Sequence, residues 1–250
     1  MSKLGEPLRK LKKLSRLLPE GRYRRALRYG VAAAVEHASL LRTLDCTTVL
    51  DVGANVGQFA LAARVCLPNA TIHSFEPLVR PAAVFRRVFE GDAQVQLHQV
   101  AIGQATATVA MHVSEKDDSS SLLPITNLQN RLFPGTAERG LERVRVEPLT
   151  AMLSPEALHS PVLLKLDVQG FELPVLEGCG RMLERVDLVY VECSFVELYE
   201  KQALAEEIVL FLRERGYSLR GVHNVTYDPA GRAVQGDFFF ARARTLPCAF

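Results

Sequence analysis

The 250-residue sequence contains few cysteines, no tryptophan and no long hydrophobic run. Its five cysteines are scattered and none forms a Cys-x-x-Cys pair: Cys46, Cys66, Cys179, Cys193 and Cys248. This pattern argues against a disulfide framework and against a structural zinc site. No stretch approaches the roughly 20 uncharged apolar residues that a membrane-spanning helix requires, so the sequence does not predict an integral membrane protein.

The composition is that of an ordinary soluble domain. Hydrophobic residues make up 48% of the chain and charged residues 23%, which is enough apolar material for one full core. The basic residues among the first 13 positions are not followed by an apolar core and a cleavage site, so they do not predict a secretory signal. We therefore expect a cytoplasmic protein.

Positive charge gathers at the start of the chain. Residues 1–28 contain ten Lys or Arg against Glu6 and Glu20, a local balance of +8 in a chain whose net charge is +2, so the remainder is acidic. Leucines also recur in this segment every three to four residues, a spacing that predicts an amphipathic helix with a basic face. These leucines are Leu4, Leu8, Leu11, Leu14, Leu17 and Leu18.

Two interpretations of this basic helix remain open. It docks on its own domain or on a second subunit of a homo-oligomer, or it lies on an anionic membrane as a peripheral contact through residues 1–28. We do not expect a nucleic-acid partner, because aromatic residues make up 7% of the chain, no zinc-finger or RNP-like motif occurs, and the body of the chain is acidic. The predicted organisation is a basic amphipathic helical arm over residues 1–44 and a domain over residues 45–250.

Strand-like runs alternate with helical patterns through most of this domain, which predicts a doubly wound α/β fold with a mostly parallel sheet. Two late alternating segments flank a turn and predict an antiparallel hairpin at the end of the sheet. The expected architecture is a seven-stranded, Rossmann-like sheet. Its predicted strands are Thr47–Val52, Ala70–Phe75, Val95–Ala101, Val162–Leu166, Leu188–Val191, Tyr217–Val222 and Asp237–Arg242. Residues 104–160 interrupt the alternation, and we interpret them as an insertion that faces the substrate.

The sharpest motif follows the first predicted strand. Residues 49–57 read Val-Leu-Asp-Val-Gly-Ala-Asn-Val-Gly, so the strand runs directly into a glycine-spaced turn. Ligands of open α/β sheets bind at this edge, where the strands end. The spacing between Gly53 and Gly57 differs from the Gly-x-Gly-x-x-Gly pattern that holds a pyrophosphate. Glu76 ends the next strand, a position from which an acidic side chain binds the hydroxyls of a ribose.

Five segments in order then resemble one family. They are residues 50–57, the Phe-Glu-Pro of 75–77, the Val-Ala-Ile-Gly of 100–103, the Ser-Ser-Ser-Leu of 119–122 and the Leu-Lys-Leu-Asp-Val-Gln-Gly-Phe-Glu of 164–172. Over about residues 44–242 the chain resembles the FkbM-type family of class I S-adenosylmethionine-dependent methyltransferases. The family often has Glu where this chain has Gln169.

The resemblance implies that S-adenosylmethionine is the cofactor and assigns residues to it. The turn would line the methionine part, Glu76 the ribose and residues 100–102 the adenine, while residues 119–121 would close over cofactor or substrate. The implied cofactor residues are Asp51, Gly53, Ala54, Asn55, Val56, Gly57, Glu76, Pro77, Val100, Ala101, Ile102, Ser121 and Asp167.

Four residues are candidates for catalysis. Asp167 and Glu192 end consecutive strands, so they could act as base and orienting group, or together hold a divalent cation such as Mg²⁺. Lys165 interrupts a buried apolar run and either orients substrate or forms a structural ion pair with Glu172 or Glu192. His223 is a candidate general base, with a packing role as the alternative.

The implied function is methyl transfer to a hydroxyl of a sugar or a glycosylated metabolite, such as a glycolipid, a polysaccharide or a natural product. An NAD(P)-dependent oxidoreductase is an alternative on the same sheet, although the chain lacks a Gly-x-Gly turn and a Tyr-x-x-x-Lys pair. A second alternative is a membrane-surface binding module that uses the basic arm and keeps a vestigial cofactor pocket.

Overall fold

The computed structural model describes residues 15–242. The helices in this range are α2 (Gly21–Leu27), η1 (Val35–His37), α3 (Ala38–Leu41), α4 (Gln58–Cys66), α5 (Val79–Val88), η2 (Asp117–Ser119), α6 (Asn127–Leu132), α7 (Leu149–Met152), η3 (Pro155–Ala157), α8 (Glu172–Gly178), η4 (Gly180–Arg185) and α9 (Ala205–Glu214). The strands are β1 (Thr48–Val52), β2 (Thr71–Phe75), β3 (Val95–His98), β4 (Ala101–Ile102), β5 (Ala107–Ser114), β6 (Glu138–Glu147), β7 (Val162–Leu166), β8 (Leu188–Ser194), β9 (Tyr217–Tyr227) and β10 (Ala233–Arg242).

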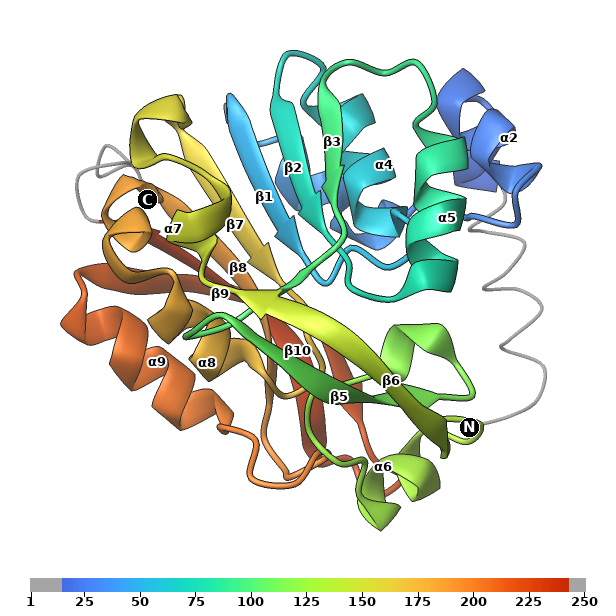
Figure 1. Cartoon of the computed structure of the whole chain (residues 1–250), viewed down its shortest axis with the longest axis vertical. Coiled ribbons are helices and arrows are strands. Elements are labelled where there is room, and N and C mark those ends of the chain that lie inside the picture. Colours follow the sequence, from blue (N-terminus) through green and yellow to red (C-terminus); the bar gives the residue numbers. More distant parts are fainter. Residues whose placement is uncertain (1–14, 243–250) are drawn as a thin grey trace.

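Seven of the strands in residues 15–242 form the main sheet, in the order β3-β2-β1-β7-β8-β10-β9 (Figure 1). All pairs are parallel except those of β10, which runs antiparallel to β8 and β9. The predicted seven-stranded, mostly parallel sheet with an antiparallel C-terminal hairpin is therefore confirmed. Every position of β1 and β7 is buried, as expected for central parallel strands that are covered on both faces.

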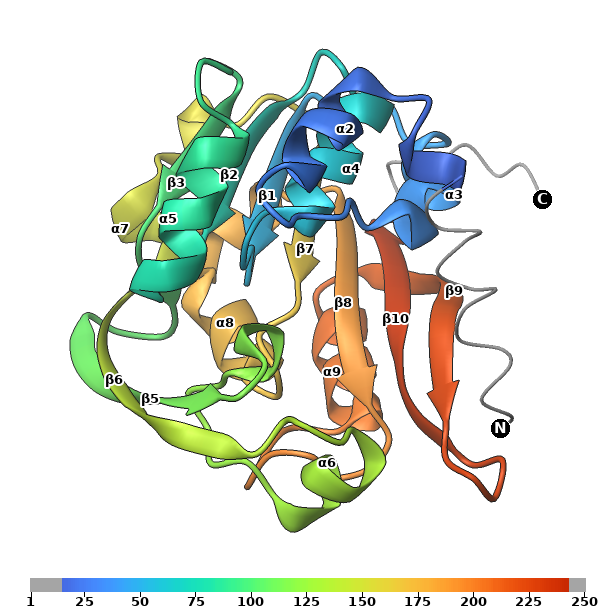
Figure 2. The same cartoon turned by 90° about the vertical axis from the view of Figure 1, so that its right-hand side faces the viewer.

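Side chains alternate between the two faces of the sheet and build a separate core on each. On one face, residues such as Val49 and Leu163 pack with α2, α3, α4 and α5. On the other, Leu50 and Leu164 pack with α7, α8, η4 and α9. Figures 1 and 2 show these two helical layers on opposite sides of the sheet.

The predicted strand Val95–Ala101 is wrong in its second half, because the chain leaves the main sheet after His98. The Val100 N–H donates to the His98 carbonyl in a tight turn, and Ala101 then pairs with Val146. Strands β4, β6 and β5 form a second, three-stranded sheet, of which β5 and β6 come from the predicted insertion. Figures 1 and 2 show β5, β6 and α6 beside the end of the main sheet where its parallel strands finish.

Residues 15–44 pack as part of the domain. Leu17, Tyr23 and Ala26 are buried in the same core as β1 and α4, and so are Val31 and Leu41. An ion pair between Arg22 and Asp92 also joins α2 to the loop before β3. Residues 1–14, with the first four leucines of the basic arm, lie outside the described range. Among the residues described, no helix has the length and hydrophobicity that a membrane span needs.

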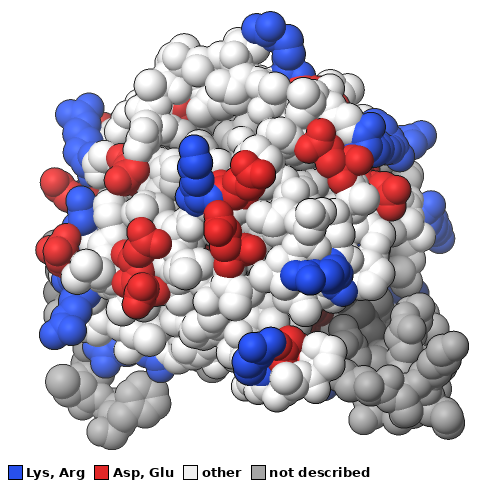
Figure 3. Space-filling view, turned by 90° about the horizontal axis from the view of Figure 1, so that it is seen from below, with Lys and Arg blue, Asp and Glu red and all other residues white. Residues whose placement is uncertain are grey.

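Charged side chains of both signs lie on the surface at which the parallel strands end. Figure 3 looks onto this side, and its Lys and Arg side chains are interspersed with Asp and Glu among uncharged residues. In this view the surface is not a continuous basic patch.

Substitutions of two adjacent leucines, Leu17 and Leu18, test whether the start of the described chain packs into the core. The Leu17 side chain is 2% exposed, and that of Leu18 is 48% exposed. We expect Leu17→Ala to lower the free energy of unfolding by about 2 kcal/mol or more, because it leaves a cavity in the core. Leu18→Ala should change it by less than about 0.5 kcal/mol. Urea denaturation measures both values, and equal effects would contradict the observed packing.

Candidate active site

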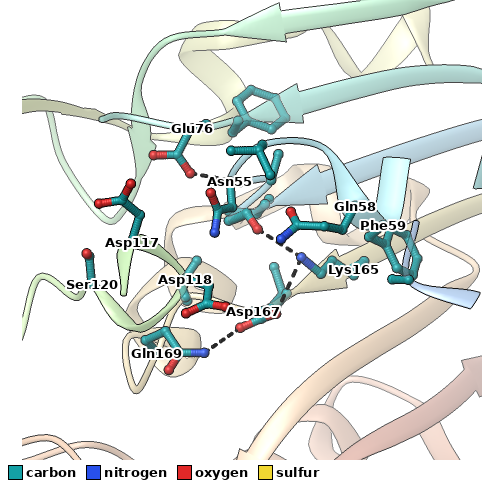
Figure 4. A pocket seen from close by; sticks show the side chains of 18 of the residues that line it. Asn55, Gln58, Phe59, Glu76, Asp117, Asp118, Ser120, Lys165, Asp167 and Gln169 are labelled. Atoms are coloured by element: carbon teal, nitrogen blue, oxygen red, sulfur yellow. Dashed lines mark hydrogen bonds and ion pairs between the residues drawn. The ribbon is translucent and has the colours of Figure 1, made fainter. Parts of the chain in front are cut away.

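A cavity of about 450 Å³ lies at the carboxyl ends of β1, β2 and β7. Its walls come from parts of the chain that are far apart in sequence. They are residues 75–78, parts of the ranges 30–37, 52–59, 101–122 and 165–171, and Tyr190 and Asp237. Figure 4 shows Glu76 and Asn55 on one side of it and Phe59 with Lys165 on another. The volume is within the range of about 300–1,000 Å³ that is usual for small-molecule sites.

A buried ion pair lies beside the cavity: Lys165 lines it, whereas Asp51, a predicted cofactor residue, is fully buried and does not. Asp51 on β1 and Lys165 on β7 are directly paired in register, so both side chains project from the same face of the sheet. The Lys165 Nζ lies 3.0 Å from Asp51 Oδ1 and donates to the Gly53 carbonyl, also at 3.0 Å. The predicted partners, Glu172 and Glu192, are therefore wrong, because the register of β1 against β7 decides the pairing.

The protonation of Lys165 follows from this pairing. Burial alone would lower the pKa of its ammonium group, but the nearby carboxylates of Asp51 and Asp167 more than offset the burial and raise it. Lys165 therefore stays charged, and its Nζ also lies 5.4 Å from the centre of the Phe59 ring.

The turn after β1 depends on glycine at two positions. Gly53 has φ +78°, and a Cβ there would lie 1.8 Å from the Asp167 carbonyl oxygen. Gly57 has φ +91°, and a Cβ there would lie 2.6 Å from the Phe89 ring. Side chains at these positions would push the turn away from β7 and α5. The glycine spacing thus allows the backbone to approach closely and to begin α4 at Gln58.

Glu76 connects this turn to the end of β2. Its Oε2 accepts a hydrogen bond from the Asn55 N–H at 2.9 Å, and its Oε1 accepts one from the Leu78 N–H at 2.8 Å. Burial raises the pKa of the Glu76 carboxyl to about 7, although these two backbone donors oppose the shift. Beside it, Asn55 Oδ1 is buried and has no hydrogen-bond partner within the described chain.

Apolar side chains line one wall of the cavity. Ala101 and Ile102 line it as predicted, together with Met111, Leu122 and Phe171, which the sequence analysis did not single out. Val100 is fully buried in the core and does not line the cavity. Met111 and Leu122 belong to the predicted insertion, whose sequence carries no recognisable motif.

The carboxylates of Asp167 and Glu192 are joined through Gln169. The Gln169 Nε2 donates to Asp167 Oδ1 at 2.7 Å and to Glu192 Oε2 at 3.1 Å, while the Tyr199 hydroxyl donates to Gln169 Oε1 at 2.6 Å. Burial, and after it the nearby carboxylate of Asp167, raises the pKa of the Glu192 carboxyl well above its usual range. Asp167 lines the cavity, and Glu192 lies behind Gln169, where it also accepts from Gln235.

This arrangement does not fit the predicted Mg²⁺ site. A hydrogen-bond donor lies between Asp167 and Glu192 where a cation would need oxygen ligands. Within residues 15–242, no three His, Cys, Asp or Glu side chains are grouped as metal ligands.

Two further predicted residues lie beside the cavity. The Ser121 hydroxyl is buried and donates to the Gln169 carbonyl at 2.6 Å, so Ser120 lines the cavity in its place. The His223 ring packs edge-on against Tyr190, with 6.1 Å between ring centres, and is not part of the lining. Ala54, Val56 and Pro77 line the cavity as predicted. Gly57 does not line it and lies close to the Phe89 ring.

The sequence analysis missed several polar residues of the lining. They are Glu36, His37, Asp117, Asp118, Tyr190 and Asp237. The sequence contained a signal for one of them: Asp237 is a charged residue at the start of a predicted strand and is followed by three phenylalanines. Tyr190 lies two residues from Glu192, so both side chains are on one face of β8. His37 comes from the predicted arm, and nothing local in its sequence links it to this site.

Comparison with known proteins identifies the family. Residues 51–219 match the methyltransferase FkbM domain. The chain belongs to the FkbM methyltransferase family. It is 30% identical over 170 residues to 2-O-methyltransferase NoeI of Sinorhizobium fredii, covering 66% of this chain and 70% of that protein. It is 26% identical over 214 residues to 31-O-demethyl-FK506 methyltransferase FkbM of Streptomyces tacrolimicus, covering 74% and 77%.

Among solved structures, the chain is similar to precorrin-6y C5,15-methyltransferase of Geobacter metallireducens. The TM-score is 0.45 at 14% identity, covering 84% of this chain and 87% of the other. Membership of the FkbM family confirms the predicted enzyme class, an S-adenosylmethionine-dependent methyltransferase, over the oxidoreductase alternative.

The residues present fit S-adenosylmethionine. The apolar wall at Ala101 and Ile102 suits an adenine ring, and the Glu76 carboxylate suits the ribose hydroxyls. The unpartnered Asn55 Oδ1 is an acceptor for a cationic amine near the turn. Gly53 and Asn55 would hold the methionine part.

The Asp51–Lys165 pair should be essential for stability. Lys165→Met leaves the fully buried Asp51 carboxylate without its cation, and we expect the free energy of unfolding to fall by about 3–5 kcal/mol. Adding Asp51→Asn to this variant should recover part of the loss. Urea denaturation measures both, with Lys201→Met at an exposed lysine as control. A loss no larger than that of the control would contradict the assignment.

The pKa of Glu76 makes cofactor affinity depend on pH. Ribose hydroxyls donate to the ionised carboxylate, whose fraction increases as the pH rises through a pKa of about 7. We therefore expect the affinity for S-adenosylhomocysteine to increase about tenfold from about pH 6 to about pH 8 and then to level off. Calorimetric titration of the wild type and of Glu76→Gln tests this. The variant should bind more weakly and without this pH dependence; a wild type without it would refute the role of Glu76.

Proposed function

We propose that the enzyme methylates a hydroxyl of a sugar or of a glycosylated metabolite, such as a glycolipid, a polysaccharide or a natural product. One observation carries this proposal: in addition to Glu76, the cavity wall holds a set of carboxylate and amide side chains. They are Glu36, Asp117, Asp118, Asp167, Gln169 and Asp237. Such groups are acceptors for the several hydroxyl donors that a sugar presents at once.

The names of two relatives support oxygen as the methyl acceptor. NoeI is a 2-O-methyltransferase and FkbM acts on 31-O-demethyl-FK506. For the present chain, the carboxylates of the cavity wall support an acceptor that carries several hydroxyl groups.

The bound cofactor supplies a methyl group that an oxygen nucleophile can attack. The protein contributes alignment and control of the proton. The side chain of Asp167 is 42% exposed at the end of β7 and lines the cavity, which places it to orient the acceptor hydroxyl. Lys165 does not serve as a base, because its pairing with Asp51 keeps it protonated.

The proposal is tested with S-adenosylmethionine that carries an isotopically labelled methyl group. Wild-type enzyme is incubated with glycosides, with their free aglycones and with deoxy analogues that lack one sugar hydroxyl at a time. We expect NMR to find the label on a sugar oxygen, and the matching deoxy analogue to remain unlabelled. Label confined to the aglycone, or to nitrogen or carbon, would contradict the proposal.

A matched pair of variants locates the sugar. Asp118 lines the cavity, whereas Glu115 lies exposed in the same segment and does not. We expect Asp118→Asn to lower kcat/KM for the glycoside about tenfold, through loss of a charged hydrogen-bond acceptor, without a change in S-adenosylhomocysteine affinity. Glu115→Gln should leave both quantities unchanged. Equal kinetics for the two variants would remove Asp118 from the acceptor site.

A further inference from the structure

His37, Tyr190 and Asp237 form a cluster at the end of the cavity opposite Glu76. Glu76 ends β2, whereas Tyr190 lies on β8 and Asp237 on β10, on the other side of β1 and β7 in the sheet. His37 comes from η1 and closes this end from the N-terminal segment. Since the cofactor residues extend from Ile102 and Glu76 to the Gly53 turn, the cluster faces the part of the cavity left for the acceptor.

The shortest contact of His37 Nδ1 and the carboxylate beside it favour a proton on this nitrogen. The Tyr190 hydroxyl donates to Asp237 Oδ2 at 3.1 Å, so its oxygen is an acceptor for His37 Nδ1, which lies 3.0 Å away. Asn224 Nδ2 donates to the same Asp237 oxygen at 2.8 Å, and it also lies 3.3 Å from His37 Nδ1 and 3.4 Å from the Tyr190 oxygen. His37 Nδ1 is also 3.6 Å from Asp237 Oδ2, which further favours a proton on this nitrogen. A neutral ring protonated at Nδ1 leaves Nε2 with a free electron pair.

Packing holds the ring of His37 in this orientation. It lies edge-on to Phe59, with 5.4 Å between ring centres, and edge-on to Tyr190, with 5.5 Å. The side chain is 17% exposed and lines the cavity. Because two aromatic rings and a hydrogen bond hold the side chain in one rotamer, little entropy is lost in orienting it for a reaction.

The surroundings keep the ring neutral. Burial lowers the pKa of His37, and the charge of Lys165 acts in the same direction, although the carboxylates oppose them. The charged or titratable groups around the ring are Glu36 on its own element, Asp237 on β10, Tyr190 on β8, His223 on β9, and Lys165 and Asp167 at the end of β7. An imidazole that is neutral near pH 7 can accept a proton.

We propose that His37 is the general base that removes the proton of the acceptor hydroxyl, and that Tyr190 and Asp237 are positioning residues for it. This assignment rests on the proposed hydroxyl acceptor. The hydroxyl oxygen forms a bond to the methyl carbon as the bond from that carbon to sulfur breaks, with the electron pair of the broken bond remaining on sulfur. The hydroxyl proton passes to His37 Nε2, which gives an imidazolium stabilised by Asp237 through Tyr190. His37 and Asp237 both lie outside residues 51–219, which match the family domain.

Two histidines beside Tyr190 provide a matched test. We expect His37→Gln to lower kcat about 10²–10⁴-fold with unchanged S-adenosylhomocysteine affinity, and to abolish the acidic limb of the kcat/KM pH profile. His223→Gln, on the other side of the Tyr190 ring and outside the cavity lining, should leave kcat and the profile unchanged. Asp237→Asn should lower kcat and shift the acidic limb to lower pH, because it removes a charge that favours the imidazolium.

A second measurement does not depend on turnover. Nitrogen-15 NMR of the full-length protein without ligands should show His37 protonated at Nδ1 and not at Nε2, with a pKa below the usual 6.5. Protonation at Nε2, or an unchanged kcat in His37→Gln, would overturn the assignment. Loss of S-adenosylhomocysteine affinity in His37→Gln would also overturn it and assign His37 to the cofactor. If wild-type enzyme labels no hydroxyl, the proposed function fails, and the NMR result reports separately on His37.

Discussion

The buried ion pair between Asp51 and Lys165 is the interaction on which the site depends. It joins β1 to β7 at the point where both strands end, and the same ammonium group holds the Gly53 carbonyl. The glycine turn is thereby fixed against β7, and its Asn55 N–H reaches the Glu76 carboxylate at the end of β2. Three strand ends are thus connected by an ion pair and hydrogen bonds among side chains that are all buried. A buried ion pair of this kind contributes little net free energy to folding, because desolvation of the two charges offsets their attraction. Removing either partner alone would strongly destabilise the fold, because it would leave a buried charge unpaired.

Around this fixed centre, the two ends of the cavity are built from different parts of the chain. Ile102, Met111 and Leu122 supply an apolar wall from the second sheet and its loop. His37 and Asp237 supply the opposite end from the N-terminal segment and the last strand. The residues that the family resemblance assigns to the cofactor lie on one side of this cavity, and we propose that the acceptor occupies the other. Enzymes that share the family motifs can accept different substrates, because the motifs do not determine the residues around the acceptor.

Much of the sheet could be predicted from the sequence, because buried parallel strands such as Val162–Leu166 are continuous apolar runs. The family resemblance and the position of Glu76 at a strand end also predicted residues that the structure brings to one cavity, such as Asn55, Glu76 and Ile102. The partner of Lys165 could not be predicted, since it depends on the register of two strands that are far apart in sequence. The departure of Ala101 into a second sheet has the same cause, because a pattern of alternation does not say with which strand a segment pairs. His37 was missed for a related reason: its role depends on contacts with β8 and β10.

A crystal structure of the complex with S-adenosylhomocysteine tests the central claim most directly, namely that cofactor and acceptor occupy opposite ends of one cavity. The account predicts the ribose hydroxyls on Glu76, the adenine against Ala101 and Ile102, and the sulfur near the Gly53 turn, with the space in front of His37 left open. A homocysteine group seated on His37 and Asp237, or an adenosine at that end of the cavity, would contradict it.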